Sequence, residues 1–174
     1  MATPSLLQAW DLTVGLNYGQ FHLQTDDPYN AAKTETARVV DQAFSGQGIA
    51  QHFGLIVVRS PHQSNFEMGL RVEVWDGHPS DEDHWQECFE TDLVVGRGGL
   101  VYDSPALSSF AIPVPPGQYH LRIDGRGFSE HGWPGSTTPG DEWRLRLWPC
   151  EEGHEANRLS SWTDSLPRRV DVAE

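Results

Sequence analysis

The sequence predicts a mainly β fold, a β-sandwich of antiparallel strands with one helix inserted near residues 30–44. Short apolar segments recur along the 174 residues, and in most of them apolar and polar residues alternate, as on a strand buried on one face. The 17 glycines and 12 prolines supply the turns that many short strands need. Seven tryptophans, seven phenylalanines and four tyrosines suit the half-buried surface of a sheet. About eight strands without a linker predict a single domain over residues 1–174.

The N-terminal segment shows the strand pattern first. Trp10, Leu12, Val14 and Leu16 alternate with polar or small residues. A turn at residues 17–19 and renewed alternation from residue 20 predict a hairpin or a bulged strand over residues 8–25. The continuous apolar run at residues 53–58 predicts a strand that is buried on both faces.

The clearest amphipathic strand covers residues 66–75, and its pattern predicts that Leu70 and Val72 point into the core. A second strand ends at residue 95, so residues 66–95 are predicted to form a hairpin around an acidic turn at residues 76–83. Leu121 is predicted to be another core residue. Further strands are predicted at residues 100–102, 110–114, 119–123 and 143–147, followed by a polar C-terminal tail at residues 150–174, packed as a short helix or loosely held.

One segment departs from the strand pattern. Between residues 30 and 44 the apolar side chains fall at spacings of three and four, the period of an amphipathic helix. Asn30 suits the N-cap and Gly46 suits the C-terminal end.

The chain carries neither a basic, apolar leader nor an apolar run of about 18 residues, the length that a membrane span needs. We therefore expect a cytoplasmic protein with no membrane partner. In that compartment its two cysteines, Cys88 and Cys150, are expected to be reduced thiols.

No motif of nucleophilic catalysis or phosphate binding occurs, so the sequence predicts a protein that is not an enzyme and has no cofactor. Two alternatives stay open. Exposed tryptophans could stack a sugar or another flat ligand, and the candidates are Trp75, Trp133 and Trp148. A small metal-dependent enzyme could use imidazole and carboxylate ligands, for which the candidates are His78, Asp81, Asp83 and His84.

Acidity is the most distinctive property of the chain. The net charge of −13 disfavours direct binding to nucleic acid or to an anionic membrane and favours a basic protein partner. From Val72 to Gly96 there is no Lys or Arg. This segment allows two interpretations. It is either a surface that binds a basic partner or a solvated turn whose charges prevent association between sheet edges. If the segment is functional, its partner-binding residues are Asp81, Glu82, Asp83, Glu87 and Glu90.

Three stretches within residues 9–124 resemble the ComJ-type competence proteins, which are inhibitors of a DNA-entry nuclease. The first joins Trp10-Asp-Leu-Thr-Val to Tyr18-Gly-Gln-Phe, and the second is Phe53-Gly-Leu-Ile-Val-Val-Arg. The third is Phe110-Ala-Ile-Pro-Val-Pro-Pro-Gly-Gln-Tyr-His-Leu. The resemblance implies a small acidic protein that binds and blocks a nuclease, and it assigns no functional residue.

Overall fold

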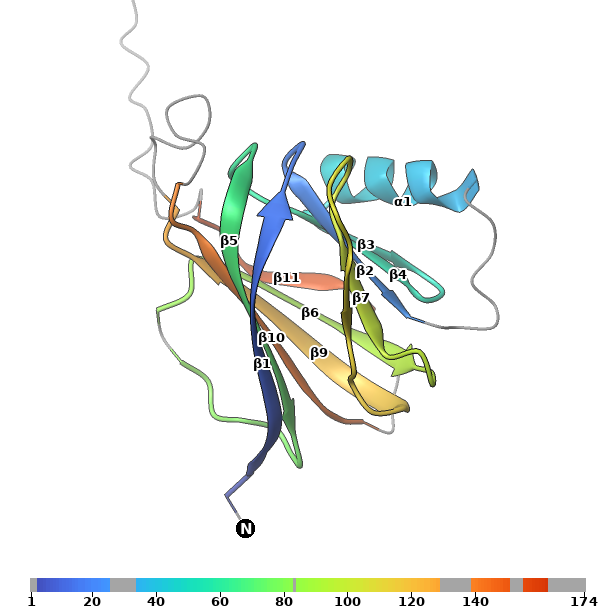
Figure 1. Ribbon diagram of the computed structural model, residues 1–174, viewed down its shortest axis with the longest axis vertical. Coiled ribbons are helices and arrows are strands. Elements are labelled where there is room, and N and C mark those ends of the chain that lie inside the picture. Colours follow the sequence, from blue (N-terminus) through green and yellow to red (C-terminus); the bar gives the residue numbers. More distant parts are fainter. Residues whose placement is uncertain (1–2, 26–33, 83, 129–138, 151–154, 163–174) are drawn as a thin grey trace, which may run out of the picture.

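The computed structural model describes residues 3–25, 34–82, 84–128, 139–150 and 155–162. Within them lie eleven strands and one helix (Figure 1). The elements are β1 (Leu6–Leu16), β2 (Gln20–Thr25), α1 (Thr34–Ser45), β3 (Ile49–His52), β4 (Leu55–Arg59), β5 (Asn65–Trp75), β6 (Glu87–Val95), β7 (Leu100–Asp103), β8 (Phe110–Ile112), β9 (Gly117–Arg126), β10 (Glu142–Pro149) and β11 (Asn157–Ser160).

The strands form two sheets. The larger has the order β1-β5-β10-β9-β6-β11 and the smaller the order β3-β4-β2-β7-β8. All strand pairs are antiparallel except β5 and β10, which run parallel in the middle of the larger sheet. The predicted mainly β fold with one helix is confirmed.

The main core lies between the two sheets. Phe21 on β2 contacts Trp143 on β10 edge-on, with ring centroids 5.1 Å apart, and stacks on Tyr102 of β7. The Tyr102 hydroxyl donates a hydrogen bond to the Gly15 carbonyl of β1, which joins the sheets a second time. The predicted core residues Leu70, Val72 and Leu121 are all buried in this cluster.

The hairpin or bulged strand predicted over residues 8–25 and the hairpin predicted over residues 66–95 are both wrong, although their strands are present. β1 and β2 belong to different sheets and share only an isolated bridge between Asn17 and Gln20. The chain therefore crosses the sandwich at Tyr18 and Gly19, which both have positive φ angles. β5 and β6 lie in one sheet, but β10 and β9 separate them. Alternation shows which face of a strand is buried and says nothing about its neighbour.

The helix begins at Thr34 where it is described, and its predicted cap Asn30 lies outside the described residues. It packs Val39 and Ala43 on Ala50 of β3 and Leu55 and Val57 of β4, a second and smaller core. At its C-terminal end the amide of Gly46 donates to the Gln42 carbonyl and the amide of Gly48 to that of Ala43. None of the described helices is long and apolar enough to cross a membrane.

Two short strands were not predicted from the sequence. β3 precedes the predicted apolar strand, and the strand itself begins at Leu55, because Phe53 forms the turn with a φ of 46° and an exposed side chain. β11 lies within the described part of the polar tail, residues 155–162, and it pairs with β6 as a strand instead of forming a helix.

A buried polar contact fastens the loop after β4 to the start of β10. One carboxylate oxygen of Asp141 accepts hydrogen bonds from the Asn65 side chain at 2.7 Å and lies 3.0 Å from His62 Nδ1. All three side chains are buried. Because β10 enters the sheet one residue later, this contact helps to position the parallel pair β5–β10.

Truncation of the core tests the register of β5. Leu70→Ala is expected to lower the free energy of unfolding by about 2–5 kcal/mol, because it removes buried methyl groups and leaves a cavity. The exposed Leu7→Ala is the matched control and should change it little. Chemical denaturation measures both variants, and an unchanged midpoint for Leu70→Ala would contradict the register.

Removal of the buried acceptor tests the Asp141 contact. Asp141→Ala should lower the free energy of unfolding by about 1–3 kcal/mol, because buried donors lose their acceptor. Glu142→Ala, on the neighbouring exposed residue, is the control. Equal stability of the two variants would show that the contact does not stabilise the fold.

Candidate functional site

The outer face of the larger sheet carries charged side chains from three adjacent strands. In the strand register, Arg144 of β10 lies between Arg71 of β5 and Asp124 of β9. One step along, Arg146 lies between Glu73 and Arg122. Each of the two β10 arginines therefore has an acidic residue opposite it on one neighbouring strand and an arginine opposite it on the other. The like-charged pairs are unfavourable by themselves, so the carboxylates on this face are needed to balance the arginines.

Asp124 is the centre of this cluster. It is fully buried, with a side-chain exposure of 0%. Arg122 donates to it at 3.0 Å, Arg144 at 3.3 Å, and Arg146 Nη2 lies 3.1 Å away. A buried carboxylate is costly unless it is paired, and these three arginines supply the pairing.

The described parts of the loop between β5 and β6, residues 76–82 and 84–86, lie over the same face. Asp81 accepts a hydrogen bond from Arg122 at 2.5 Å, and Glu82 accepts one from Arg144 at 3.0 Å. Arg146 donates to the backbone carbonyl of Ser80 at 3.0 Å. The acidic loop is thus held on the sheet by three arginines.

Trp85 secures the far end of the loop. Its ring lies 4.5 Å from the guanidinium carbon of Arg126 and 4.4 Å from that of Arg144. Two cation–π contacts on one indole, each worth about 0.5–1 kcal/mol at a partly exposed site, hold the loop where β6 begins.

The charges of the cluster alter the pKa values of its members. Burial raises the pKa of the Glu82 carboxyl, but the charge and hydrogen bond of Arg144 outweigh it, and the pKa lies below its ordinary value. For Arg146 burial lowers the pKa, Asp124 opposes this, and Arg144 and Arg122 add to it. Glu82 is therefore more strongly ionised in the folded protein than in the unfolded chain.

The predicted partner-binding residues do not form one exposed acidic surface. Asp81 and Glu82 are 64% and 51% exposed but already paired with arginines. Asp83 lies outside the described residues. Glu90 is 31% exposed, with an oxygen 3.5 Å from His120 Nε2.

Glu87 is buried and is not part of an exposed surface. It is 1% exposed and binds Arg158 at 2.8 Å and the amide of Trp162 at 2.9 Å, both in the C-terminal segment. Its neighbour Phe89, two residues on, is buried on the same face of β6. The Glu87 carboxylate therefore attaches β11 and cannot reach a partner.

The fold brings arginines from other strands against the segment at residues 72–96. That segment has no Lys or Arg, yet β9, β10 and β11 bring Arg122, Arg144 and Arg158 against its carboxylates. These arginines are far away in the sequence, so local composition could not show them.

The two described tryptophans of the ligand-stacking alternative are engaged in contacts within the protein. Trp148 is 8% exposed and packs between His78 and His120, with centroid distances of 4.7 and 4.6 Å. The indole N–H of Trp75 donates to Glu73. Trp133 lies outside the described residues.

The metal alternative gains no support from the described ligands. His78 packs on Trp148, while Asp81 pairs with Arg122. His84 is exposed, and Asp83 is not described. In the described part of the chain, three or more His, Cys, Asp or Glu side chains nowhere gather closely enough to hold a metal ion.

A groove of about 750 Å³ lies at the edge of the sandwich, where the two sheets and the helix meet. Its walls come from the end of α1, from β3 and the turn that follows it, from the second half of β6, and from the start of the β11 segment. The described lining residues are Gln42, Gly46, Gln47, Ile49, Ala50, Gln51, His52, Phe53, Gly54, Asp92, Leu93, Val94, Gln118, Glu155 and Ala156. Because the walls come from separate segments, no motif in the sequence marks this groove.

Charge reversal in the loop tests its attachment to the sheet. From the sequence alone, replacing the carboxylates at residues 81–83 by lysines is predicted to leave the stability of the fold unchanged. The ion pairs of Asp81 and Glu82 predict instead that this charge reversal destabilises the protein. Asp81→Lys combined with Glu82→Lys should lower the free energy of unfolding by roughly 1 kcal/mol, because lysines then face Arg122 and Arg144.

The matched control for this reversal is Asp41→Lys combined with Glu67→Lys, which changes the net charge equally at two exposed positions. Urea denaturation at low salt compares the two variants. Equal midpoints would mean that the loop is not held by its carboxylates.

Comparison with known proteins adds evidence on the fold. No family model matches the chain, and no curated protein matches it. Among solved structures, ComJ from Bacillus subtilis, described as an inhibitor of the DNA-degrading activity of NucA, is similar with a TM-score of 0.55 and 13% sequence identity. The match covers 86% of this chain and 100% of ComJ.

The protein of crocagin biosynthetic gene J is similar with a TM-score of 0.53 and 13% identity, over 83% of this chain and 98% of its own. Both matches span almost the whole of the other protein, so the likeness concerns the complete fold. The resemblance predicted from the sequence is confirmed at this level: the chain has a ComJ-type fold at low sequence identity.

Proposed function

We propose that the protein is a non-enzymatic binding protein of the inhibitor type, which blocks a basic partner such as a DNA-degrading enzyme. The observation that carries the proposal is the fold shared with ComJ, an inhibitor of a nuclease, over the full length of ComJ. A common fold alone does not establish a function, so the proposal also draws on the net charge of the protein and on the contacts of its ionisable side chains.

The net charge supports a basic partner. At −13 the chain attracts cationic surfaces over a distance and repels nucleic acid. The half-exposed carboxylates of Asp81 and Glu82 stay candidates for this attraction, although each is paired with an arginine. Electrostatic attraction of this kind raises the rate of association more than the affinity.

The contacts of the ionisable side chains support a binding role. His62, Asp124 and Glu87, which in another setting could do acid–base chemistry, are buried in pairs that connect strands and loops. Cys88 and Cys150 form no disulfide with each other, and burial raises the pKa of Cys88, which disfavours a nucleophilic thiolate. Reduced cysteines accord with the cytoplasmic location that we propose.

Retention of a nuclease tests the proposal. The immobilised protein is incubated with lysate of its source cell at low salt, and bound proteins are eluted at high salt. We expect the eluate to degrade DNA, and we expect added free protein to suppress that activity once the salt is removed, because charged contacts re-form at low ionic strength.

An immobilised protein of equal net charge and unrelated fold is the control for simple ion exchange. ComJ with NucA serves as the reference inhibitor pair for the cleavage assay. The proposal is contradicted if the eluate lacks DNA-degrading activity, or if that activity persists with the free protein in excess.

A further inference from the structure

We propose that the protein forms a two-fold symmetric dimer, in which the first half of β1 pairs antiparallel with the same strand of a second copy, centred on Trp10. The partner at this edge is another copy of the chain, so the inference is independent of the proposed function. Pairing of an edge strand with its own copy continues the sheet from one molecule into the next, and two-fold dimers are the commonest soluble oligomers.

The length of β1 is unusual for an edge strand. It forms one margin of the larger sheet and has eleven residues (Figure 1). The other strands at the margins of the two described sheets, β3, β8 and β11, have only three or four residues. Short edge strands, lysines and prolines prevent edges from pairing between molecules. β1 is long and contains no Lys, Arg or Pro, so it lacks these protections.

The open side of β1 is limited to its first half. Within the described ranges, β1 pairs with β5 alone, and no backbone group of residues 6–12 bonds to a described residue outside that strand. Further along, the Gly15 carbonyl accepts a hydrogen bond from Tyr102, and the Leu107 side chain lies against Gly15. A second copy can therefore approach the first half of the strand and not its end.

The regularity and charge of β1 select the register of the dimer. The strand pairs with β5 without irregularity from Gln8 to Val14. Pairing centred on Asp11 would place two carboxylates opposite each other, which is unfavourable. Pairing centred on Trp10 avoids this contact and uses residues 8–12, all within the regular stretch. It also brings together the two half-buried indole rings, and aromatic pairs across strands are favourable.

The charge of the edge favours a second copy over a basic partner. Residues 6–10 are uncharged. The one carboxylate of β1, that of Asp11, accepts hydrogen bonds from Arg71 on both of its oxygens, each at 2.8 Å. A basic segment would therefore find no unpaired carboxylate on this strand. Leu6 and Leu7 are 42% and 59% exposed, so a partner at this edge gains mainly by burying apolar surface.

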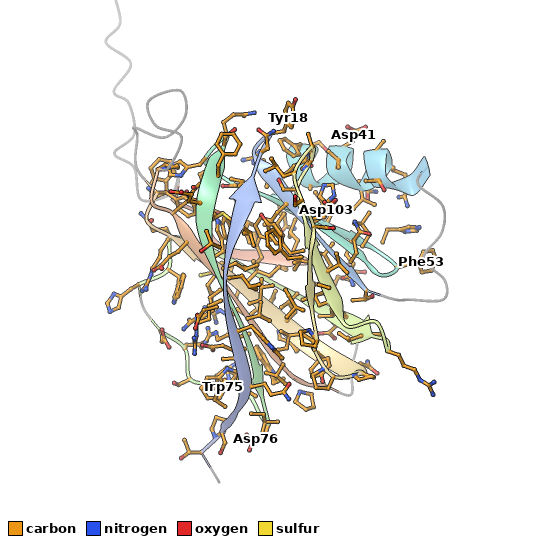
Figure 2. All side chains as sticks on the ribbon, in the orientation of Figure 1. Tyr18, Asp41, Phe53, Trp75, Asp76 and Asp103 are labelled. Carbon is orange, nitrogen blue, oxygen red and sulfur yellow. The ribbon has the colours of Figure 1, made fainter. Side chains whose placement is uncertain are left out.

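An apolar pocket of about 230 Å³ lies beside the open edge. Gln8, Val74 and Trp75 form part of its wall, and Figure 2 shows Trp75 next to the first half of β1. Pairing centred on Trp10 places Leu12 of the second copy opposite Gln8 and on the same face of the sheet, at this pocket. The symmetry repeats the contact, so each copy buries a leucine of the other.

Sedimentation equilibrium of the full-length protein tests for the dimer. We expect the average molar mass to rise from that of one chain towards that of two as the concentration increases. Because each copy carries a net charge of −13, salt should strengthen the dimer by screening the repulsion. Binding of a basic partner has the opposite salt dependence. The mass of one chain at every concentration up to about 200 μM would overturn the proposal, as would a dimer that salt weakens.

A matched pair of variants locates the interface. Gln8→Lys places a charge on the apolar face of the edge, opposite Leu12 of the second copy, and should weaken the dimer about tenfold or more. Gln42→Lys makes the same change at an exposed position of α1 and should dimerise as the wild type does. Both positions are exposed, so urea denaturation should show both variants to be folded. Equal dimerisation of the two variants would contradict an interface at β1.

A cysteine on the symmetry axis tests the register. In a Cys150→Ser background, Trp10→Cys should form a disulfide between copies on mild oxidation. Opposed residues of antiparallel strands have Cα atoms about 4.5–5.5 Å apart, which lies within the range that a disulfide spans. Ala9→Cys in the same background would face position 11 of the second copy and not itself, so it should cross-link much more slowly. Equal cross-linking of the two variants would overturn the pairing centred on Trp10.

Discussion

The buried carboxylate of Asp124 is the contact on which the larger sheet depends. It is surrounded by guanidinium groups from its own strand and from β10, and each of these arginines also reaches the loop between β5 and β6. Loss of the carboxylate would leave several buried positive charges together. The same arginines therefore stabilise both the pairing of β9 with β10 and the position of the β5–β6 loop on the sheet.

This arrangement explains why acidity is a poor guide to the binding surface of this protein. The chain has 25 acidic and 12 basic residues, yet the stretch without basic residues is the one that the fold surrounds with arginines. Net charge acts over the whole molecule and can steer a partner from a distance. Net charge therefore does not identify which part of the surface a partner would contact.

The sequence predicted the fold class well and the strand neighbours poorly, for a physical reason. Alternation at Leu70 and Val72 reports burial of one face, and both side chains are in the core. The partner of a strand depends on long-range pairing, so β5 was assigned to β6 although it pairs with β1 and β10. The same limit applies to the candidate site. Alternation along β6 places Glu87 on the same face as Phe89, but it cannot show that Glu87 binds Arg158, which lies 71 residues away in the sequence.

The parallel pairing of β5 with β10 has a consequence for the order in which the chain can assemble. β10 separates the β1–β5 pair from the β9–β6 pair, and it is the tenth of the eleven described strands. A ribosome that has released β5, which ends at Trp75, must still translate as far as Glu142 before the strand that joins the two halves begins. Until then one edge of β5 has no partner, so the nascent chain carries an open strand edge while residues 76–142 are made, the condition under which chaperones bind.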